Sequence, residues 1–414
     1  MPNNGTSVFA QIIGLIDKNI FARTVRKYNG DKYAKGFTCW QQLVSMEFLQ
    51  FGKAQSLSEI CLGLGTCIGR LSHLGLAHGP KKSTLAYANE NRSFEIYRDT
   101  FFELLHKAQS TIGGKHKFRF KNKLFSMDAT TIDLCLSIFD WARFRRAKGA
   151  IKLHLLLDHD GYLPVFVYIT AGKTQEVRIA KEVIIRGFSF PKGSFIVFDR
   201  GFNDYSLFAH WCRSGVFFVT RMKDNTLYDV LTKNEVPKNS RILRDEIIYL
   251  NGVGASETCD HELRRIEVWD DVNHKVIVLL TNHLTFGSTT ISAIYKDRWQ
   301  IETFFKTIKQ NLKIKTFVGT TPNAVKIQLW TALITILLLK MLKGMAKYGW
   351  SMSNLVAMLR FNLFTYHDLM QWLDDPKHSP PFVPDEQLAL FEFGQHEQGA
   401  CFQLPNKLVQ YAYY

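Results

Sequence analysis

The sequence predicts an α/β fold in which a mixed sheet is flanked by helical regions at both ends of the chain. Two apolar runs that each lead into an aspartate read as central strands, at residues 124–127 and 195–198. Short β-rich runs divided by turn clusters occupy residues 240–283. With 414 residues and 46% apolar content, the chain can form two or three domains with substantial cores.

The first hundred residues predict helices. Residues 37–51 read as an amphipathic helix, and residues 85–105 read as another. Between them, Ser56-Leu-Ser-Glu59 has the spacing of a capping box and should open a further helix. The local sequence fits a helix-turn-helix unit, a generic helical bundle or a dimerisation module equally well.

The first candidate site residue is Asp128. It follows the apolar run at residues 124–127 and is expected at the carboxyl end of that strand or just beyond it. Residues 152–158 and 163–170 flank Asp160-Gly161, a strong hairpin signal, so two more strands should follow. A helix near residues 175–185 then leads to the next strand.

The second candidate is Asp199, which ends the apolar run at residues 195–198. Gly201 breaks that strand, and residues 205–211 read as a helix that leaves the sheet. In open α/β sheets, sites form outside the carboxyl ends of strands, where both aspartates are expected. Either aspartate could instead be a turn former or a helix cap. A strand at residues 216–220 and the β-rich runs beyond it predict an insertion before the next helix.

The third candidate, Glu302, lies on a helix predicted over residues 295–309. At about 100° per residue, Glu302 is the single carboxylate on a stripe that also holds Tyr295, Arg298, Lys306 and Lys309. The apolar residues of the segment share a separate face, made of Ile301, Phe304, Phe305, Ile308 and Leu312. Exposed ion pairs one turn apart are the alternative explanation for the stripe. A metal ion that meets a phosphate explains a lone carboxylate among cations better.

Three convergent carboxylates suit hard divalent cations such as Mg²⁺ or Mn²⁺, which prefer oxygen ligands and bridge to phosphates. A pair of such ions can activate an attacking water or hydroxyl and stabilise the leaving oxygen. This is the chemistry of nucleases, polymerases and DNA strand transferases.

The motif Tyr295-x2-Arg298-x3-Glu302-x6-Lys309 is similar to the signature of DDE transposases of the insertion-sequence-4 group. Asp199-Arg-Gly-Phe also resembles the second-acid motif of that group. The resemblance implies a ribonuclease H-like catalytic core in which Asp128, Asp199 and Glu302 are the catalytic and metal-binding residues, with two Mg²⁺ or Mn²⁺ ions. It also implies DNA-binding roles for Tyr295, Arg298 and Lys309. Lys306 lies outside the signature, but its positive charge makes it a further candidate for DNA binding.

The same resemblance implies a domain order and an activity. Residues 1–110 would form a helical DNA-binding domain, residues 120–345 the catalytic domain with a β-rich insertion at about 221–285, and residues 346–414 a helical C-terminal region. The expected activity is that of a DNA transposase, which cuts element ends and joins them to target DNA by metal-dependent transesterification, as a homodimer in the DNA complex. The alternatives are a nuclease that cuts without joining and a non-catalytic DNA-binding regulator, which the presence of all three acids disfavours.

One position departs from relatives that pass through a hairpin intermediate. Those relatives hold an extruded base with an aromatic side chain in the insertion, and the comparable place here is near Ile277, which cannot stack on a base. Trp269 lies on a neighbouring β-rich run and is expected to be a core residue of the sheet.

Composition agrees with a polyanionic partner. The chain has 52 Lys and Arg residues against 37 Asp and Glu, a net charge of +15. Clusters of cations at residues 115–123 and 143–152 are expected to meet phosphates, although solvated surfaces would look the same. Seven cysteines without a close pair favour a reducing compartment such as the cytoplasm, and the resemblance implies a bacterial, nucleoid-associated protein. The longest apolar stretch, residues 329–339, is too short to cross a bilayer and predicts a buried helix, with no membrane partner.

Overall fold

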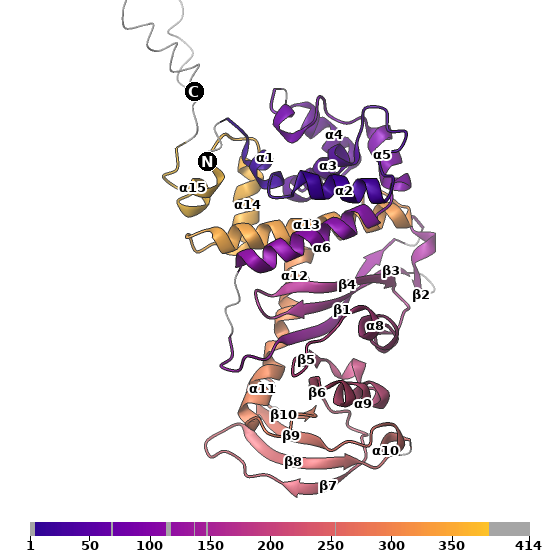
Figure 1. Cartoon of the computed structure of the whole chain (residues 1–414), viewed down its shortest axis with the longest axis vertical. Helices are drawn as coiled ribbons and strands as arrows, with labels where there is room; N and C mark the ends of the chain where they lie inside the picture. The colour runs from indigo at the N-terminus through magenta and orange to yellow at the C-terminus, as the bar shows by residue number, and fades with distance from the viewer. Residues whose placement is uncertain are drawn as a thin grey trace, which may run out of the picture.

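The computed structural model describes residues 5–67, 69–112, 117–135, 137–145, 148–252 and 254–380. Along its long axis, a group of N-terminal helices is followed by two long helices that lie side by side, and then by a large sheet (Figure 1). The final strands of the sheet occupy the end of the molecule opposite the N-terminal helices. The described part of the chain is therefore a mixed α/β fold.

In the described residues, the α-helices before the sheet are α1 (Val8–Ile13), α2 (Lys18–Lys27), α3 (Cys39–Gly52), α4 (Leu57–Gly65), α5 (Lys82–Asn91) and α6 (Glu95–Ile112). The expectation of an amphipathic helix at residues 37–51 is wrong, because α3 is buried nearly all round by α2, α4, α13 and α14. Residues 85–105 form two helices and not one, since Arg92 takes an extended conformation between them. The hydroxyl of Ser56 accepts from the amide of Glu59, as the capping signal predicts.

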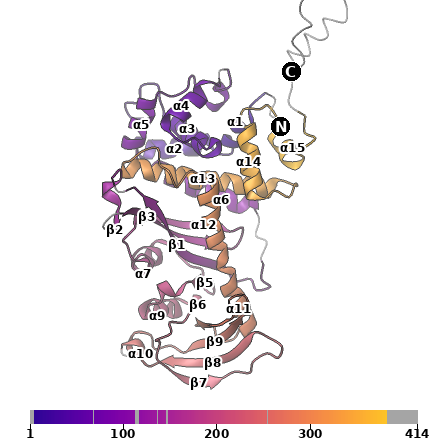
Figure 2. The same cartoon turned by 180° about the vertical axis from the view of Figure 1, so that it is seen from behind.

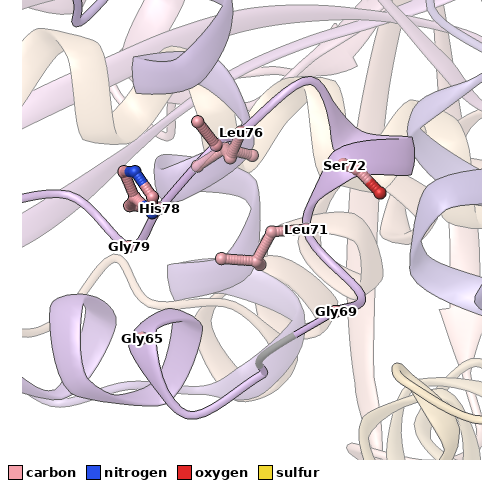
Figure 3. Close-up of a pocket in the computed structure, with 8 residues that line it drawn as sticks. Gly65, Gly69, Leu71, Ser72, Leu76, His78 and Gly79 are labelled. Carbon is pink, nitrogen blue, oxygen red and sulfur yellow. The ribbon is translucent and has the colours of Figure 1, made fainter.

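The segment between α4 and α5 folds back onto α4. It forms a hollow of about 230 Å³ beside Leu71, Ser72 and His78 (Figure 3). Gly79 approaches Gly65 so closely that a Cβ on Gly79 would lie 2.7 Å from the Cα of Gly65. Glycine at position 79 allows the two backbones to touch, whereas a Cβ on Gly65 would meet no atom within 4 Å.

The long helix α13 (Pro322–Met345) lies beside α6 and joins the N-terminal helices to the sheet (Figure 1). Among the described residues it is the one helix long and apolar enough to cross a membrane, and 89% of its apolar window is buried inside the protein. It extends beyond the apolar stretch at residues 329–339 on both sides, and it also buries the polar side chains of Gln328, Thr331 and Thr335. We conclude that α13 is a core helix.

As far as residue 380, where the described part of the chain ends, α13 is followed by α14 (Met352–Asn362) and α15 (Leu369–Asp374), and both contact α1. They confirm the helical prediction up to residue 374. Residues 381–414 lie outside the described residues, so the expected helical region at 346–414 is described only in its first half.

Ten strands of the described chain form one sheet in the order β2-β3-β1-β5-β6-β10-β9-β8-β7, and β4 also pairs with β3. They are β1 (Leu124–Leu134), β2 (Arg143–Arg145), β3 (Lys148–Asp158), β4 (Leu163–Ala171), β5 (Phe195–Phe198), β6 (Phe217–Arg221), β7 (Tyr228–Lys233), β8 (Ile242–Leu250), β9 (Leu263–Asp270) and β10 (Lys275–Thr281). β3 is antiparallel to β1, whereas β5 is parallel to β1 and β6 is parallel to β5.

Helices cover both faces of this sheet (Figures 1 and 2). On one face lie α11 (Ser288–Asp297) and α12 (Trp299–Asn311). On the other lie α9 (Tyr205–Ser214) and a continuous helical stretch made of α7 (Glu176–Ile179), a π-helical turn over residues 180–184 and α8 (Ile185–Gly187). The stretch at 176–187 confirms the helix expected near residues 175–185.

The hairpin predicted at Asp160-Gly161 is confirmed, since β3 and β4 pair across it and Gly161 has a φ of +79°. The β-rich runs predicted over residues 240–283 are strands, β8 to β10. Together with β7 they continue the main sheet, because β10 pairs with β6. Trp269 on β9 is half-buried and lies outside the buried apolar clusters of the described residues, so the expectation that it is a core residue is wrong.

Candidate active site

Strand pairing brings the first two acids together. Met127 of β1 pairs with Phe198 of β5 in a parallel register, and Asp128 and Asp199 are the residues that directly follow this pair in the sequence. Neighbouring strands lie about 4.8 Å apart, so the two aspartates start from adjacent backbone positions. Asp199 follows the end of β5 as expected. Asp128 lies within β1 and not at its end, because β1 continues its antiparallel pairing with β3 as far as Leu134.

The helix that carries Glu302 crosses β1 and brings a cation between two acids. Nη2 of Arg298 lies 2.7 Å from Oε1 of Glu302, and Nη1 of Arg298 lies 3.9 Å from Oδ2 of Asp128. The side chain of Arg298 is only 10% exposed, and its Nε has no hydrogen-bond partner. Arg298 therefore neutralises Asp128 and Glu302 in place of another cation.

Tyr295 connects the same segment to Asp199. Burial raises the pKa of Tyr295; the positive charge of Arg298 opposes this shift, and the negative charge of Asp199 adds to it. The guanidinium of Arg298 also lies 5.7 Å from the centre of the Tyr295 ring, within the range of a cation–π contact. Residues 295–302 thus interact with all three candidate acids.

Asp128 lies in an environment that disfavours its charge. Burial raises the pKa of Asp128 to about 6, although the amide of Ala129 and the guanidinium of Arg298 both favour the ionised form. The negative charges of Glu176 and Glu302 raise the pKa further. A divalent cation would remove this penalty.

Glu176 is a fourth acid that the sequence analysis did not identify. It begins α7, its Oε1 lies 3.1 Å from Nζ of Lys152, and its charge acts on Asp128. It also reaches the turn after Asp199, where a Cβ on Gly201 would lie 3.7 Å from Oε2 of Glu176. No spacing motif marks Glu176, so only the folded chain reveals its position.

The predicted basic stripe is less regular than a single helix would make it. The segment 295–309 is divided between α11 and α12. At the junction, the amide of Arg298 donates to the carbonyl of Tyr295, and the amide of Ile301 donates to the carbonyl of Arg298. Arg298 is buried rather than exposed, whereas Lys306 is exposed. The predicted apolar face is confirmed, because all five of its residues are buried, namely Ile301, Phe304, Phe305, Ile308 and Leu312.

A cleft of about 460 Å³ opens beside the acids, between β1 and α12. Its lining residues are Asp128, Ala129, Thr130, Glu302, Phe305, Lys306, Lys309, Gln310 and Lys315. Nζ of Lys309 donates to the carbonyl of Thr131 at 2.9 Å, and burial lowers the pKa of Lys309. Lys315 is a further cation of the cleft that the sequence analysis did not identify. Two acids and three lysines thus line one opening.

The residues around this cleft fit a divalent cation by their chemistry. Carboxylate oxygens are the ligands that Mg²⁺ and Mn²⁺ prefer, and a guanidinium already lies between two of them. In the described ranges no three His, Cys, Asp or Glu side chains are grouped closely enough to hold an ion. Binding of a metal by Asp128 and Glu302 would therefore require the side chain of Arg298 to move.

Comparison with known proteins agrees with this geometry. The family profile for the transposase DDE domain matches residues 119–338, more than half of the chain, and a domain of unknown function (DUF4372) matches residues 4–77. A putative transposase of Sinorhizobium fredii is 30% identical over 63% of this chain and 71% of its own length. A probable insertion-sequence transposase of Geobacillus stearothermophilus is 26% identical over 56% of this chain and 60% of its own length.

A putative insertion-sequence transposase of Synechocystis is 23% identical over 70% of this chain and 80% of its own length. The structure of a piggyBac transposase synaptic complex with hairpin DNA aligns with a TM-score of 0.39 at 13% identity, over 93% of this chain and 83% of that one, which is too weak a likeness to support an argument. The matched DDE domain spans the sheet and α12, and so includes Asp128, Asp199 and Glu302. The chain belongs to the DDE transposases of insertion sequences, enzymes that cut and transfer DNA strands.

Proposed function

We propose that Asp128, Asp199 and Glu302 are the catalytic residues of this transposase, on a ribonuclease H-like core. The strand order β4-β3-β1-β5-β6, with β3 antiparallel and β5 parallel to β1, supports such a core. The observation that carries the proposal is the position of Arg298 between Asp128 and Glu302, two acids that line a cleft together with three lysines.

In this proposal the three acids hold two divalent ions, Mg²⁺ or Mn²⁺. Asp128 on β1 and Asp199 directly after β5 would hold the first ion, and Glu302 would help to hold the second. When bound, such ions activate an attacking water or terminal hydroxyl and stabilise the leaving oxygen of the phosphodiester. By holding these ions, the carboxylates would fix where the reacting phosphate lies.

The cationic side chains of the site would bind the phosphates of the DNA backbone. Arg298 would leave Asp128 and Glu302 when other cations neutralise them and would then contact a phosphate near the scissile bond. Lys306, Lys309 and Lys315 line the cleft. They would contact successive phosphates of the DNA strand as it leads away from the acids. Tyr295, which lies beside Arg298, would contact the same stretch of backbone.

The remaining parts are assigned by the same proposal. Residues 1–110 bind the element ends, residues 120–345 form the catalytic domain with its insertion at about 221–285, and the C-terminal region from residue 346 contributes to a homodimer in the DNA complex. The signature from Tyr295 to Lys309 supports membership of the insertion-sequence-4 group. A protein that acts on DNA in this way would work in the bacterial cytoplasm, at the nucleoid.

The test separates chemistry from DNA binding. Asp199→Asn should abolish cleavage of a labelled duplex that carries the terminal repeat of the element, while binding of this duplex in Ca²⁺ stays unchanged. The matched control is Asp224→Asn, because Asp224 is 93% exposed and pairs with Arg200 at 3.5 Å outside the cleft. Joining to a second duplex should follow cleavage with wild-type protein, which a nuclease would not do.

Metal binding provides a readout without DNA. Titration of the wild-type protein with Mn²⁺, followed by electron paramagnetic resonance, should show bound ions, and Asp199→Asn should bind fewer or bind them more weakly. Equal Mn²⁺ binding by the wild type and by Asp199→Asn, together with retained cleavage, would refute the assignment of the site.

A further inference from the structure

A second constellation of side chains lies behind the acids, and the proposed reaction does not use it. Oγ of Ser126 lies 2.7 Å from Nε2 of His159, and Nδ1 of His159 lies 2.6 Å from Oδ2 of Asp297. All three residues are buried, with exposed fractions of 0%, 9% and 2%. The arrangement is that of a serine, a histidine and an aspartate joined by hydrogen bonds.

The chemistry of the groups fixes the direction of these bonds. The Asp297 carboxylate can only accept, so Nδ1 of His159 carries the proton that joins them. In the neutral imidazole, Nε2 then accepts from the hydroxyl of Ser126. Burial by itself raises the pKa of Asp297, but hydrogen bonds from His159 and Lys117 bring it below its usual value. Asp297 is therefore a paired buried anion, which is costly to disturb.

This constellation cannot act as a hydrolase. The side chain of Ser126 is fully buried within β1, so no substrate carbonyl can reach its hydroxyl. A small opening beside Lys117, Phe118 and His159 has a volume of about 20 Å³. Such a space is enough for about one water molecule. Because a substrate cannot reach the hydroxyl, Ser126 cannot act as a nucleophile, although the order serine, histidine, aspartate is that of a nucleophilic triad.

The position of the three residues points to a different role. Ser126 is two residues before Asp128 on β1, Asp297 directly precedes Arg298 at the junction of α11 and α12, and His159 follows the end of β3. The hydrogen-bonded chain thus ties the strand of the first acid to the point from which α12 starts. On the other side of that junction, Arg298 makes the second connection, to Asp128 and Glu302.

We propose that Ser126, His159 and Asp297 are positioning residues that hold α12 against β1, so that Glu302 and Arg298 face Asp128. This inference rests on the proposed catalytic role of the three acids. Asp297 is the anchor at the helix junction, and His159 is the link between the two elements. Lys117 supports the anchor from the surface, and the ring of Tyr162 lies 5.4 Å from that of His159.

Two variants of His159 separate the links. In His159→Asn the amide can replace Nδ1 and keep the bond to Asp297, whereas in His159→Gln the longer side chain can replace Nε2 and keep the bond to Ser126. If the anchor at Asp297 positions α12, His159→Asn should retain most cleavage. In His159→Gln the cleavage rate should fall by about 10–100-fold, which is the usual effect of removing a residue that supports catalytic ligands. Binding of the element end in Ca²⁺ should be the same for both.

The second pair controls for stability. Asp297→Asn should lower the maximal cleavage rate at saturating Mg²⁺ and DNA, with little change in the DNA concentration at half-maximal rate. Asp245→Asn is the matched control, since Asp245 is as buried as Asp297 and pairs with Arg264 at 2.6 Å, away from the cleft. At temperatures where both variants are folded, Asp245→Asn should cleave as the wild type does.

A structural readout needs neither metal nor DNA. Hydrogen exchange in the metal-free protein should become faster in Asp297→Asn and His159→Gln for a peptide over residues 295–305, and should stay unchanged over α9. If Asp297→Asn fails to fold, the two His159 variants decide the matter. Equal cleavage by His159→Asn and His159→Gln, with unchanged exchange at residues 295–305, would overturn the proposal. Asp199→Asn tests the catalytic assignment separately, because its exchange pattern should remain that of the wild type.

Discussion

Replacement of Asp128 by asparagine should stabilise the metal-free protein, although it removes a proposed metal ligand. Burial and the neighbouring carboxylates raise the pKa of Asp128 from 3.8 to about 6, and its side chain is only 19% exposed. The native protein therefore binds this proton more tightly than the unfolded chain does. As the pH rises from about 4 to about 6, the free energy of unfolding falls, and it stays lower above that range.

The magnitude follows from the shift. One pKa unit corresponds to about 1.4 kcal/mol, so the ionised Asp128 costs about 3 kcal/mol of stability above pH 6. Asparagine keeps the shape and can still accept from the amide of Ala129, but it carries no charge. Asp128→Asn should therefore raise the melting temperature by about 3–4 °C in EDTA at neutral pH. Below about pH 4, where aspartate is protonated in both states, the gain should vanish.

The assay is thermal unfolding across this pH range, with EDTA or with Mg²⁺. Mg²⁺ should stabilise the wild type by binding to the native state, and it should have little effect on Asp128→Asn. Asp133→Asn is the control, because Asp133 is exposed on the same strand and its replacement should change stability by less than about 0.5 kcal/mol. If Asp128→Asn were less stable than the wild type in EDTA at neutral pH, or if its gain persisted below pH 4, the electrostatic reasoning would be refuted.

Three further predictions concern other parts of the chain. Burial raises the pKa of Glu47 to about 8, so Glu47→Gln should raise the melting temperature above that pH and change it little at about pH 4, as pH-dependent melting curves would reveal. Lys306→Ala should weaken DNA binding uniformly across sequences and reduce the salt slope by about one phosphate contact; an unchanged slope would exclude Lys306 from the DNA path. Since Trp269 is half-buried, Trp269→Ala should cost less than about 2 kcal/mol of stability, below the larger loss typical of a core tryptophan. Nicks and hairpins should be followed on a labelled end in the same variant, because a normal melting curve with arrest after the first nick would mean that Trp269 holds an extruded base.

The sequence alone was sufficient for the elements that local patterns encode. The apolar run at residues 195–198 followed by Asp199 and Gly201 predicted β5 and its end, and the hairpin at Asp160-Gly161 followed from two residues. The apolar face of α12 followed from helical periodicity. In each case the signal lies within a few residues, so no knowledge of distant contacts was needed.

Local patterns failed where packing decides the outcome. Periodicity suggested an amphipathic helix at residues 37–51. In the structure, α2, α4, α13 and α14 surround α3, so its polar residues Gln42, Glu47 and Gln50 are buried too. Likewise, β1 extends beyond Asp128 because β3 pairs with it, and a strand end cannot be read from one strand by itself.

The sequence by itself determined which acids could form a site and on which elements they lie, because each is marked by its own neighbours in the chain. Only the tertiary structure placed Arg298 between Asp128 and Glu302, brought Glu176 to the turn after Asp199, and joined Ser126 to His159 and His159 to Asp297. The last two contacts span 33 and 138 positions in the sequence. They depend on strand register and on how α11 and α12 pack on the sheet, and neither of these is encoded in a local pattern.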